Sequence, residues 1–274
     1  MTFPKTETLP KTDARRSDVA NTAVRYNIYG LVHKGLRAQM AQTLVVAGRT
    51  DWSDRDDANS ALAEIRALAQ SCRSHLQHEN HFIHPAMEAR QPGSANAAAL
   101  DHHEHEQAIA GLLADCDRVE RSALTERTPV AATLYSRLAL FIAENFEHMA
   151  MEEVDHNAVL WRHYNDGEIH AIEQALVASI EPEKAMGSLR WMMTAATPTE
   201  RAEKLRGMQQ HAPAPVFMGV LTMLQPALRA SDWRKLQIAL QLPTVDERDP
   251  AELDAVSNQQ RSARQQQQSA SVAA

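Results

Sequence analysis

Two histidines of this chain are each followed four residues later by a glutamate. The pairs are His75 with Glu79 and His148 with Glu152. Side chains at positions i and i+4 of an α-helix lie on one face, about 6 Å apart. At this spacing the histidine can bind one metal ion while the glutamate reaches across to a second. Imidazole and carboxylate ligands suit a pair of iron or manganese ions better than zinc. The pattern therefore predicts a metal centre with two ions.

Both pairs lie on the apolar faces of their predicted helices. With a turn of about 100° per residue, each glutamate lies near its histidine and beside large apolar side chains such as Phe141. The same measure points several neighbouring residues away from the core or to its edge: His78, His81, His84 and Glu153. The sequence thus predicts one buried pair on each of these two helices.

Two further helices are expected to supply ligands to the same core. His105 lies among apolar residues, Asp101 precedes it by one turn, and His102 lies about 60° away. His33 aligns with the apolar residues of an earlier helix. A buried carboxylate without a partner costs several kcal/mol, roughly, and would otherwise become protonated. A shared metal centre removes that cost.

Four long helices are predicted to position these residues, over about 17–47, 53–87, 94–122 and 128–164. Short polar turns join them, and Ser53, Ser94 and Thr128 are expected to cap three of them. Pro85 should disturb the end of the second helix. Long helices with short connections predict an all-α protein whose core is an antiparallel, up-and-down four-helix bundle.

Shorter helices are predicted after Gly167, over 168–179, 183–195, 199–211, 215–228 and 232–240. Thr197 and Glu200 have the spacing of a capping box at the start of one of them. We therefore predict four regions: a flexible arm over 1–16, the bundle over 17–166, a helical C-terminal region over 167–242, and a Gln-rich, disordered tail over 243–274.

The composition excludes several classes of protein. The chain of 274 residues has a net charge of −7, so we expect no nucleic-acid partner. No run of about 18 apolar residues is present, so no membrane span is expected. Two cysteines, Cys72 and Cys116, do not make a disulfide framework, and Cys72 is expected to be a small core residue. No apolar targeting segment is evident, which favours a cytoplasmic location.

Four segments resemble the helix motifs of the hemerythrin family, specifically its bacterial HHE-type cation-binding branch. In chain order they are LVHKGLR (31–37), HLQHENHFIHPAME (75–88), DHHEHEQAI (101–109) and EHMAMEEVDH (147–156). The resemblance covers about residues 20–165. It implies two iron ions with an oxo or hydroxo bridge, and Glu79 and Glu152 as bridging carboxylates. The implied ligands are His33, His75, Glu79, His105, His148 and Glu152.

The third of these motifs departs from the family pattern. Oxygen-carrying hemerythrins have a His-x-x-x-His pair there, whereas this chain has Asp101 four residues before His105. Three alternatives stay open. Asp101 is a ligand, His102 takes its place, or one iron keeps a water or an open position.

The resemblance implies a non-haem di-iron protein that binds, senses or handles oxygen or nitric oxide. The alternative is a di-iron oxidase or peroxidase, or a protein similar to those that repair iron–sulfur clusters. In a third interpretation, the bundle is a metal-dependent regulatory module and the C-terminal helices bind a partner. Two tyrosines that precede His33, Tyr26 and Tyr29, either pack or form hydrogen bonds to the metal site, with packing preferred. The acidic residues over 51–57 are expected to cap a helix.

Overall fold

The computed structural model describes residues 25–243, which are helical over most of their length and contain no strand. The prediction of an all-α protein is confirmed. No helix among these residues has the length and apolar character needed to cross a membrane. The predicted arm over 1–16 and nearly all of the predicted tail over 243–274 lie outside the described residues. The helices are α1 (Gly30–Arg49), α2 (Arg55–His78), α3 (His84–Arg90), α4 (Asn96–Arg121), α5 (Arg127–Met151), α6 (Asn157–His163), α7 (Asp166–Ala178), α8 (Pro182–Ala195), α9 (Pro198–His211), α10 (Ala214–Leu224) and α11 (Ala230–Leu240).

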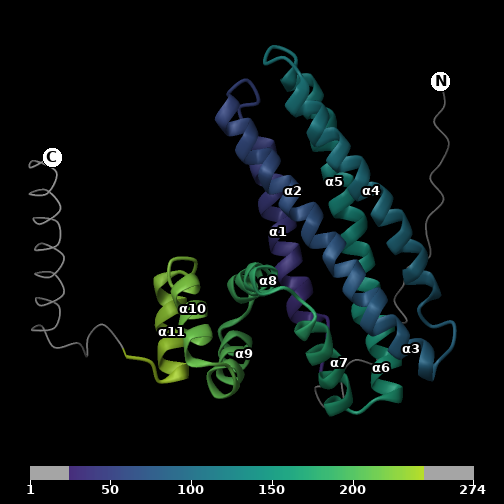
Figure 1. Ribbon diagram of the computed structural model, residues 1–274, viewed down its shortest axis with the longest axis vertical. Coiled ribbons are helices and arrows are strands. Elements are labelled where there is room, and N and C mark those ends of the chain that lie inside the picture. The colour runs from purple at the N-terminus through teal and green to yellow at the C-terminus, as the bar shows by residue number, and fades with distance from the viewer. Residues whose placement is uncertain (1–24, 244–274) are drawn as a thin grey trace, which may run out of the picture.

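Four long helices, α1, α2, α4 and α5, form a bundle in which each packs against two others. Figure 1 shows them side by side, with the chain running alternately up and down. Their apolar faces share one core, which explains why each helix forms, since packing supplies most helical stability in proteins. Its largest buried members are Met40, Leu62, Ile65, Leu68, Leu76, Ile109, Leu134, Leu138 and Met149.

A single π-helical turn interrupts the second long helix of the bundle, and another interrupts the fourth. The turns are Glu79–Ile83, between α2 and α3, and Glu152–His156, between α5 and α6. A π turn contains one residue more than an α turn, so the residues after it are rotated by about 100° relative to an unbroken helix. Each turn begins at a predicted metal-ligating glutamate.

The first bundle helix begins later than predicted. Residues 25–29 are not helical, and α1 begins at Gly30 rather than near residue 17. The Asn27 side chain explains this start, because its Oδ1 accepts hydrogen bonds from the backbone N–H groups of Tyr29 and Gly30, both at 3.0 Å. Residues 17–24 lie outside the described part of the chain.

The cap predicted for the second helix was placed one residue too early. Asp54, not Ser53, caps α2, and its carboxylate accepts hydrogen bonds from the backbone N–H groups of Asp56 and Asp57. Ser53 donates to Asp51 instead. The acidic residues in this segment thus organise the turn and the helix start, as expected.

The predicted caps Ser94 and Thr128 were wrong as well. The Glu88 carboxylate accepts hydrogen bonds from the backbone N–H groups of Gly93 and Ala95 just before α4, and the Ser94 side chain takes no part. Thr128 lies inside α5. Carboxylate capping from the preceding helix is a tertiary contact that a local cap motif does not reveal.

The base of the bundle is a second apolar cluster that includes α7. Ile28, Tyr29 and Leu160 pack there with Ile169 of α7. Arg25 connects the same cluster to the end of α6 and the start of α7. Its guanidinium donates to the backbone carbonyls of residues 161 and 164 and pairs with the carboxylate of residue 166. The division predicted between residues 166 and 167 stays a prediction, and α7 packs with the bundle rather than apart from it.

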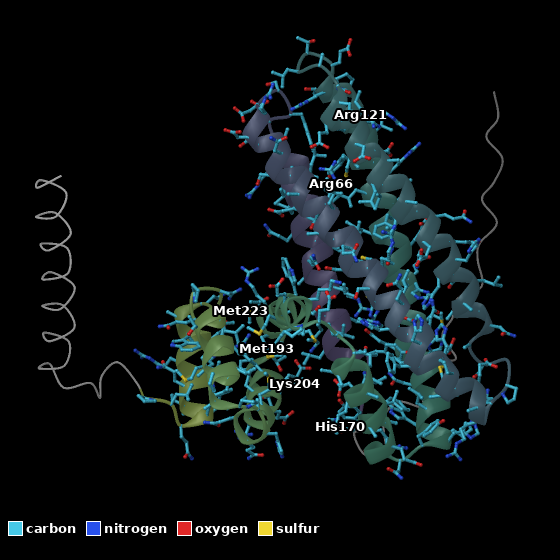
Figure 2. The ribbon with its side chains drawn as sticks, in the orientation of Figure 1. Arg66, Arg121, His170, Met193, Lys204 and Met223 are labelled. Carbon is cyan, nitrogen blue, oxygen red and sulfur yellow. The ribbon has the colours of Figure 1, made fainter. Side chains whose placement is uncertain are left out.

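Helices α8 to α11 form a separate group beside the bundle (Figure 1). Its own core includes Met193, and Figure 2 shows Met193 and Met223 inside this group. The helices predicted for this region are present, although α10 ends at Leu224 instead of residue 228. The Thr197–Glu200 capping box is formed as predicted.

Helix α8 packs directly on α1, which carries His33. The two backbones come very close, because a Cβ atom on Gly35 would lie 2.9 Å from the backbone nitrogen of Met192. Lys34 of α1 also pairs with Glu200 of α9 at 2.6 Å. The C-terminal helices are therefore seated on the helix that positions one predicted ligand.

Candidate metal centre

Four histidines from four helices meet in two pairs inside the bundle. His33 Nε2 of α1 lies 3.1 Å from His75 Nε2 of α2. His102 Nε2 of α4 lies 3.0 Å from His148 Nε2 of α5. Two nitrogen atoms at this separation can bind the same metal ion, so each pair offers two ligands to one cation.

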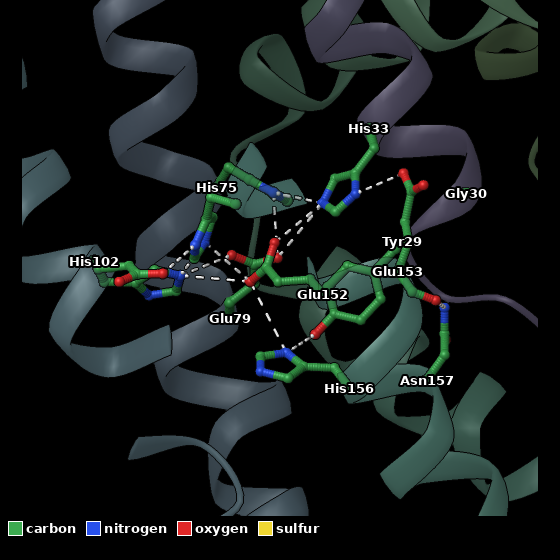
Figure 3. Close-up of polar contacts among 12 residues, drawn as sticks. Tyr29, Gly30, His33, His75, Glu79, His102, Glu152, Glu153, His156 and Asn157 are labelled. Carbon is green, nitrogen blue, oxygen red and sulfur yellow. Dashed lines mark hydrogen bonds and ion pairs between the residues drawn. The ribbon is translucent and has the colours of Figure 1, made fainter. Parts of the chain in front are cut away.

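The carboxylates of Glu79 and Glu152 lie between the two pairs (Figure 3). Glu79 directs Oε1 toward His75, at 3.2 Å, and Oε2 toward His102, at 3.5 Å. Glu152 directs Oε2 toward His33, at 3.5 Å, and Oε1 toward His148, at 3.2 Å. Each glutamate thus offers one oxygen to each histidine pair, which is how a carboxylate bridges two metal ions.

These two glutamates are buried, and their oxygens lie near histidine nitrogens without forming regular hydrogen bonds. Glu79 and Glu152 are 1% and 0% exposed, and none of their four carboxylate oxygens forms a hydrogen bond of normal geometry within residues 25–243. Buried polar groups almost always have partners, and an uncompensated buried carboxylate is costly. A pair of cations between the histidines satisfies all four oxygens, so the donor set fits the predicted group.

Protons distribute unevenly over the centre when it holds no metal. Burial and the neighbouring Glu152 raise the pKa of Glu79 to about 7. The pKa of Glu152 lies well below its ordinary value, since contacts with His102 and His148 outweigh the effect of burial. Burial would lower the pKa of His148, but Glu152 raises it to about 9. Protons on Glu79 and His148 thus take over part of the compensation that cations would give.

The Nδ1 atoms of three of these histidines are held by oxygen atoms outside the centre. His33 contacts Glu153 at 3.0 Å, His102 contacts Asn80 at 2.8 Å, and His148 contacts Asp101 at 3.2 Å. Such contacts orient the ring and leave the Nε2 lone pair free for a metal ion. They are typical of metal-ligating histidines.

The predicted outward direction of Glu153 was wrong. Its carboxylate contacts His33 and accepts a hydrogen bond from Arg37 at 2.6 Å. Contacts with both residues hold the pKa of Glu153 below its usual value, against the effect of burial. The π turn that begins at Glu152 rotates Glu153 toward α1.

The predicted outward direction of His84 was also wrong. His84 is 6% exposed and stacks on His102, with 4.8 Å between ring centroids. The preceding π turn adds one residue, so His84 rotates by about 100° from the exposed face to the core face. His81, inside the π turn, is exposed as predicted.

His156 is a buried neighbour of the centre and was not among the residues predicted for it. It follows the second π turn, is 2% exposed, and forms with His84 and Glu152 a further group whose ligand atoms lie within 4.8 Å of one another. A sequence signal for both residues exists. Each glutamate of the centre is followed by a histidine, five residues after Glu79 and four after Glu152.

In the third predicted motif, over residues 101–109, His102 is the residue that lies beside the carboxylates of Glu79 and Glu152. Asp101 contacts His148 from outside instead, and its side chain is 47% exposed. His105 is 5% exposed and packs against His148 and Phe141, with ring centroids 4.8 Å and 6.4 Å away. It is absent from the groups of converging ligand atoms among the described residues. The assignment of His105 as a ligand stays a prediction that this geometry does not favour.

One tyrosine lies at the centre and one does not. Tyr29 is fully buried, its hydroxyl lies 2.8 Å from His156 Nδ1, and its ring packs on His33. Tyr29 thus packs, as preferred, and also forms the hydrogen bond beside the centre that was the alternative. Tyr26 packs as expected and donates to Glu173 of α7, away from the centre.

Both cysteines are buried and unpaired with each other. Burial raises the pKa of the Cys72 thiol to about 12 and that of Cys116 to about 11. Thiols with such pKa values are inert at neutral pH, which agrees with Cys72 as a core residue.

A cleft of about 560 Å³ lies between α4 and α5 and reaches His148 on one side of the centre. His148 and His105 lie at its inner wall, and four acidic side chains and a methionine line the rest of it. The lining residues are Asp101, Glu104, His105, Glu144, Glu147, His148 and Met151. The cleft thus borders one histidine of the centre, whereas Glu79 and Glu152 are buried and do not line it.

Comparison with known protein families gives one match. Residues 26–155 match the family model described as the hemerythrin HHE cation binding domain. No curated protein and no solved structure matched the chain. The matched segment spans the four helices of the bundle and includes both histidine pairs and both glutamates, and it ends one residue before His156.

Proposed function

We propose that the protein is a non-haem di-iron protein that binds, senses or handles oxygen or nitric oxide, since residues 26–155 match the hemerythrin HHE cation binding domain. In this proposal His33 and His75 would hold one iron ion, and His102 and His148 would hold the other. Glu79 and Glu152 would supply carboxylate oxygens to both. A small diatomic ligand is the partner, and the cytoplasm is the proposed location.

The observation that carries the proposal is the set of four buried carboxylate oxygens between two histidine pairs. Histidine and carboxylate ligands in a bundle core are typical of di-iron and di-manganese proteins. Zinc fits less well, because structural zinc sites are closed tetrahedra and bind one ion each. Iron is preferred to manganese because of the family resemblance.

The chain's own residues set the conditions for such chemistry. Two iron ions would supply electrons to a bound diatomic molecule and take them back. Met40, Leu112 and Phe141 are buried in the adjoining core and keep water from that side of the centre. The Tyr29 hydroxyl holds His156 beside Glu152 and can move a proton to or from its Nδ1 atom. Dry surroundings slow the proton delivery that would destroy a reversible complex.

A specific observation favours an oxidase or peroxidase as a second candidate. Within residues 25–243, two histidines converge with the glutamates in each of the two proposed ion sites, and a cleft reaches His148. Fewer nitrogen ligands leave coordination positions open to a substrate such as peroxide, and the cleft lets it approach.

Metal analysis with optical spectra tests the proposal. Protein purified without oxygen should contain two iron ions per chain and develop oxo-bridge charge-transfer bands on exposure to air. A stable spectrum with oxygen supports a binding protein, whereas rapid turnover of added peroxide supports the enzyme. Variants His75→Ala and His148→Ala should each lose iron. Unchanged iron content in both variants would contradict the proposed ligands.

A further inference from the structure

The cleft beside His148 is lined by glutamates that are not proposed ligands of the metal centre. Glu104 of α4 and Glu144 and Glu147 of α5 are exposed and line one cleft. Within residues 25–243 none of the three forms an ion pair, although arginines elsewhere on the bundle are paired with acidic side chains, as Arg66 is (Figure 2). Like charges gathered in a concave surface attract cations and raise their local concentration.

His105 gives this cleft a ligand for a transition-metal ion. His105 is 5% exposed and lines the cleft. Its Nδ1 atom has no hydrogen-bond partner within residues 25–243. Among the described residues, its ring packs against the rings of His148 and Phe141.

We propose that the cleft between α4 and α5 is the route by which hydrated divalent cations reach the centre, with His105 as a transient ligand. This inference rests on the di-metal centre proposed above. The carboxylates of Glu104, Glu144 and Glu147 collect the cation and replace part of its hydration shell. His105 then binds the ion through nitrogen and passes it to the neighbouring His148.

The geometry gives His105 a role distinct from that of the resident ligands. Its ring centroid lies 4.8 Å from that of His148, so the two imidazole rings are in direct contact. His105 is nevertheless absent from both groups of converging ligand atoms. A residue placed between the acidic lining and the centre, but outside the centre, is suited to transfer rather than storage.

The kinetics of metal uptake test this route. Metal-free protein is mixed with Co²⁺ at low salt, and the visible spectrum of bound Co²⁺ is followed by stopped flow. Removing the charges in Glu104→Gln/Glu144→Gln/Glu147→Gln should slow uptake by about tenfold or more and remove most of its salt dependence. His105→Leu should slow uptake severalfold while the final spectrum and the amount of Co²⁺ bound stay unchanged. Asp101 is left intact because it contacts His148.

Glu106→Gln serves as the matched control, since Glu106 lies on the same helix and outside the cleft. It should load at the wild-type rate, and circular dichroism should show that all variants fold. Uptake at the wild-type rate in both the triple variant and His105→Leu would overturn the route. A lower final occupancy in His105→Leu would make His105 a resident ligand and also overturn its transfer role. A wild-type protein that binds no Co²⁺ would instead refute the metal centre itself.

Discussion

At Glu79, the buried carboxylate that the metal centre needs lowers the stability of the metal-free protein. Its carboxylate is buried beside that of Glu152, and neither has a normal hydrogen-bond partner. In the metal-free protein burial, together with repulsion from Glu152, raises the pKa of Glu79 to about 7 from 4.5. The folded state therefore retains a proton that the unfolded chain releases.

This proton gives the metal-free protein a pH dependence. A carboxyl group whose pKa is raised on folding stabilises the folded state fully below its unfolded pKa, and that contribution is lost as pH rises through the folded pKa. As the pH rises from about 4.5 to about 7, the free energy of unfolding of the metal-free protein should thus fall by on the order of 3 kcal/mol because of Glu79. Urea unfolding from pH 4.5 to pH 8, with wild type compared with Glu79→Gln, isolates this contribution from that of the histidines. A difference between the two proteins that does not change with pH would contradict it.

The same variant should separate stability from metal binding. Glu79→Gln removes a buried charge and offers an amide N–H group to Glu152, so the metal-free protein at pH 7.5 should be more stable by about 1–3 kcal/mol. It should also lose most of its bound metal, because glutamine bridges two cations poorly. Thermal unfolding and metal analysis on one preparation measure both effects. Glu64→Gln, on the same helix and away from the centre, should change neither.

At the scale of the element, the two π turns decide which histidines reach the core. The sequence assigned the faces of α2 and α5 correctly as far as Glu79 and Glu152, where an unbroken helix is a valid description. Beyond these residues an ideal period of 3.6 fails, since each π turn contains one extra residue. The positions of His84 and His156 follow from that single insertion.

Deleting the exposed residue His81 should test the role of the first π turn. The shorter chain would form an ordinary α-helix there and leave His84 and Met87 on the core face, because the missing residue and the lost π turn shift the later residues by about 100° in opposite directions. Met87 thus keeps its buried place at the base of the bundle, and we expect the deletion to change the stability by less than about 1 kcal/mol. His81→Ala keeps the turn and should cost less than about 0.5 kcal/mol. A loss of several kcal/mol on deletion, measured by urea unfolding, would contradict the interpretation that the π turn accommodates one extra residue.

At the scale of the whole molecule, the helices after the bundle support the centre indirectly. Helix α7 completes the apolar cluster that buries Tyr29, and α8 packs on α1 beside His33. Lys204 of α9 also contacts Glu173 of α7 at 3.2 Å, near His170, which joins these parts (Figure 2). The centre therefore depends on packing well outside the four long helices.

Two truncations should distinguish these contributions. A chain that ends at residue 165 lacks α7 and exposes the cluster around Tyr29, so its melting temperature and metal content should both fall clearly. A chain that ends at residue 181 keeps α7 and should retain the metal, with a smaller loss of stability from the exposed face of α1. Differential scanning fluorimetry with metal analysis compares them. Equal behaviour of the two chains would mean that α7 does not support the centre.

The sequence by itself determined the helical class, the positions of most helices and the two His-x-x-x-Glu pairs. These features follow from local periodicity and spacing, which a helix converts directly into shared faces. Only the tertiary structure decided that His102 rather than Asp101 meets the carboxylates, that His105 stands beside the centre, and that His84 and His156 are buried. Those outcomes depend on π turns and on packing between helices, and both are set by contacts between residues far apart in the chain.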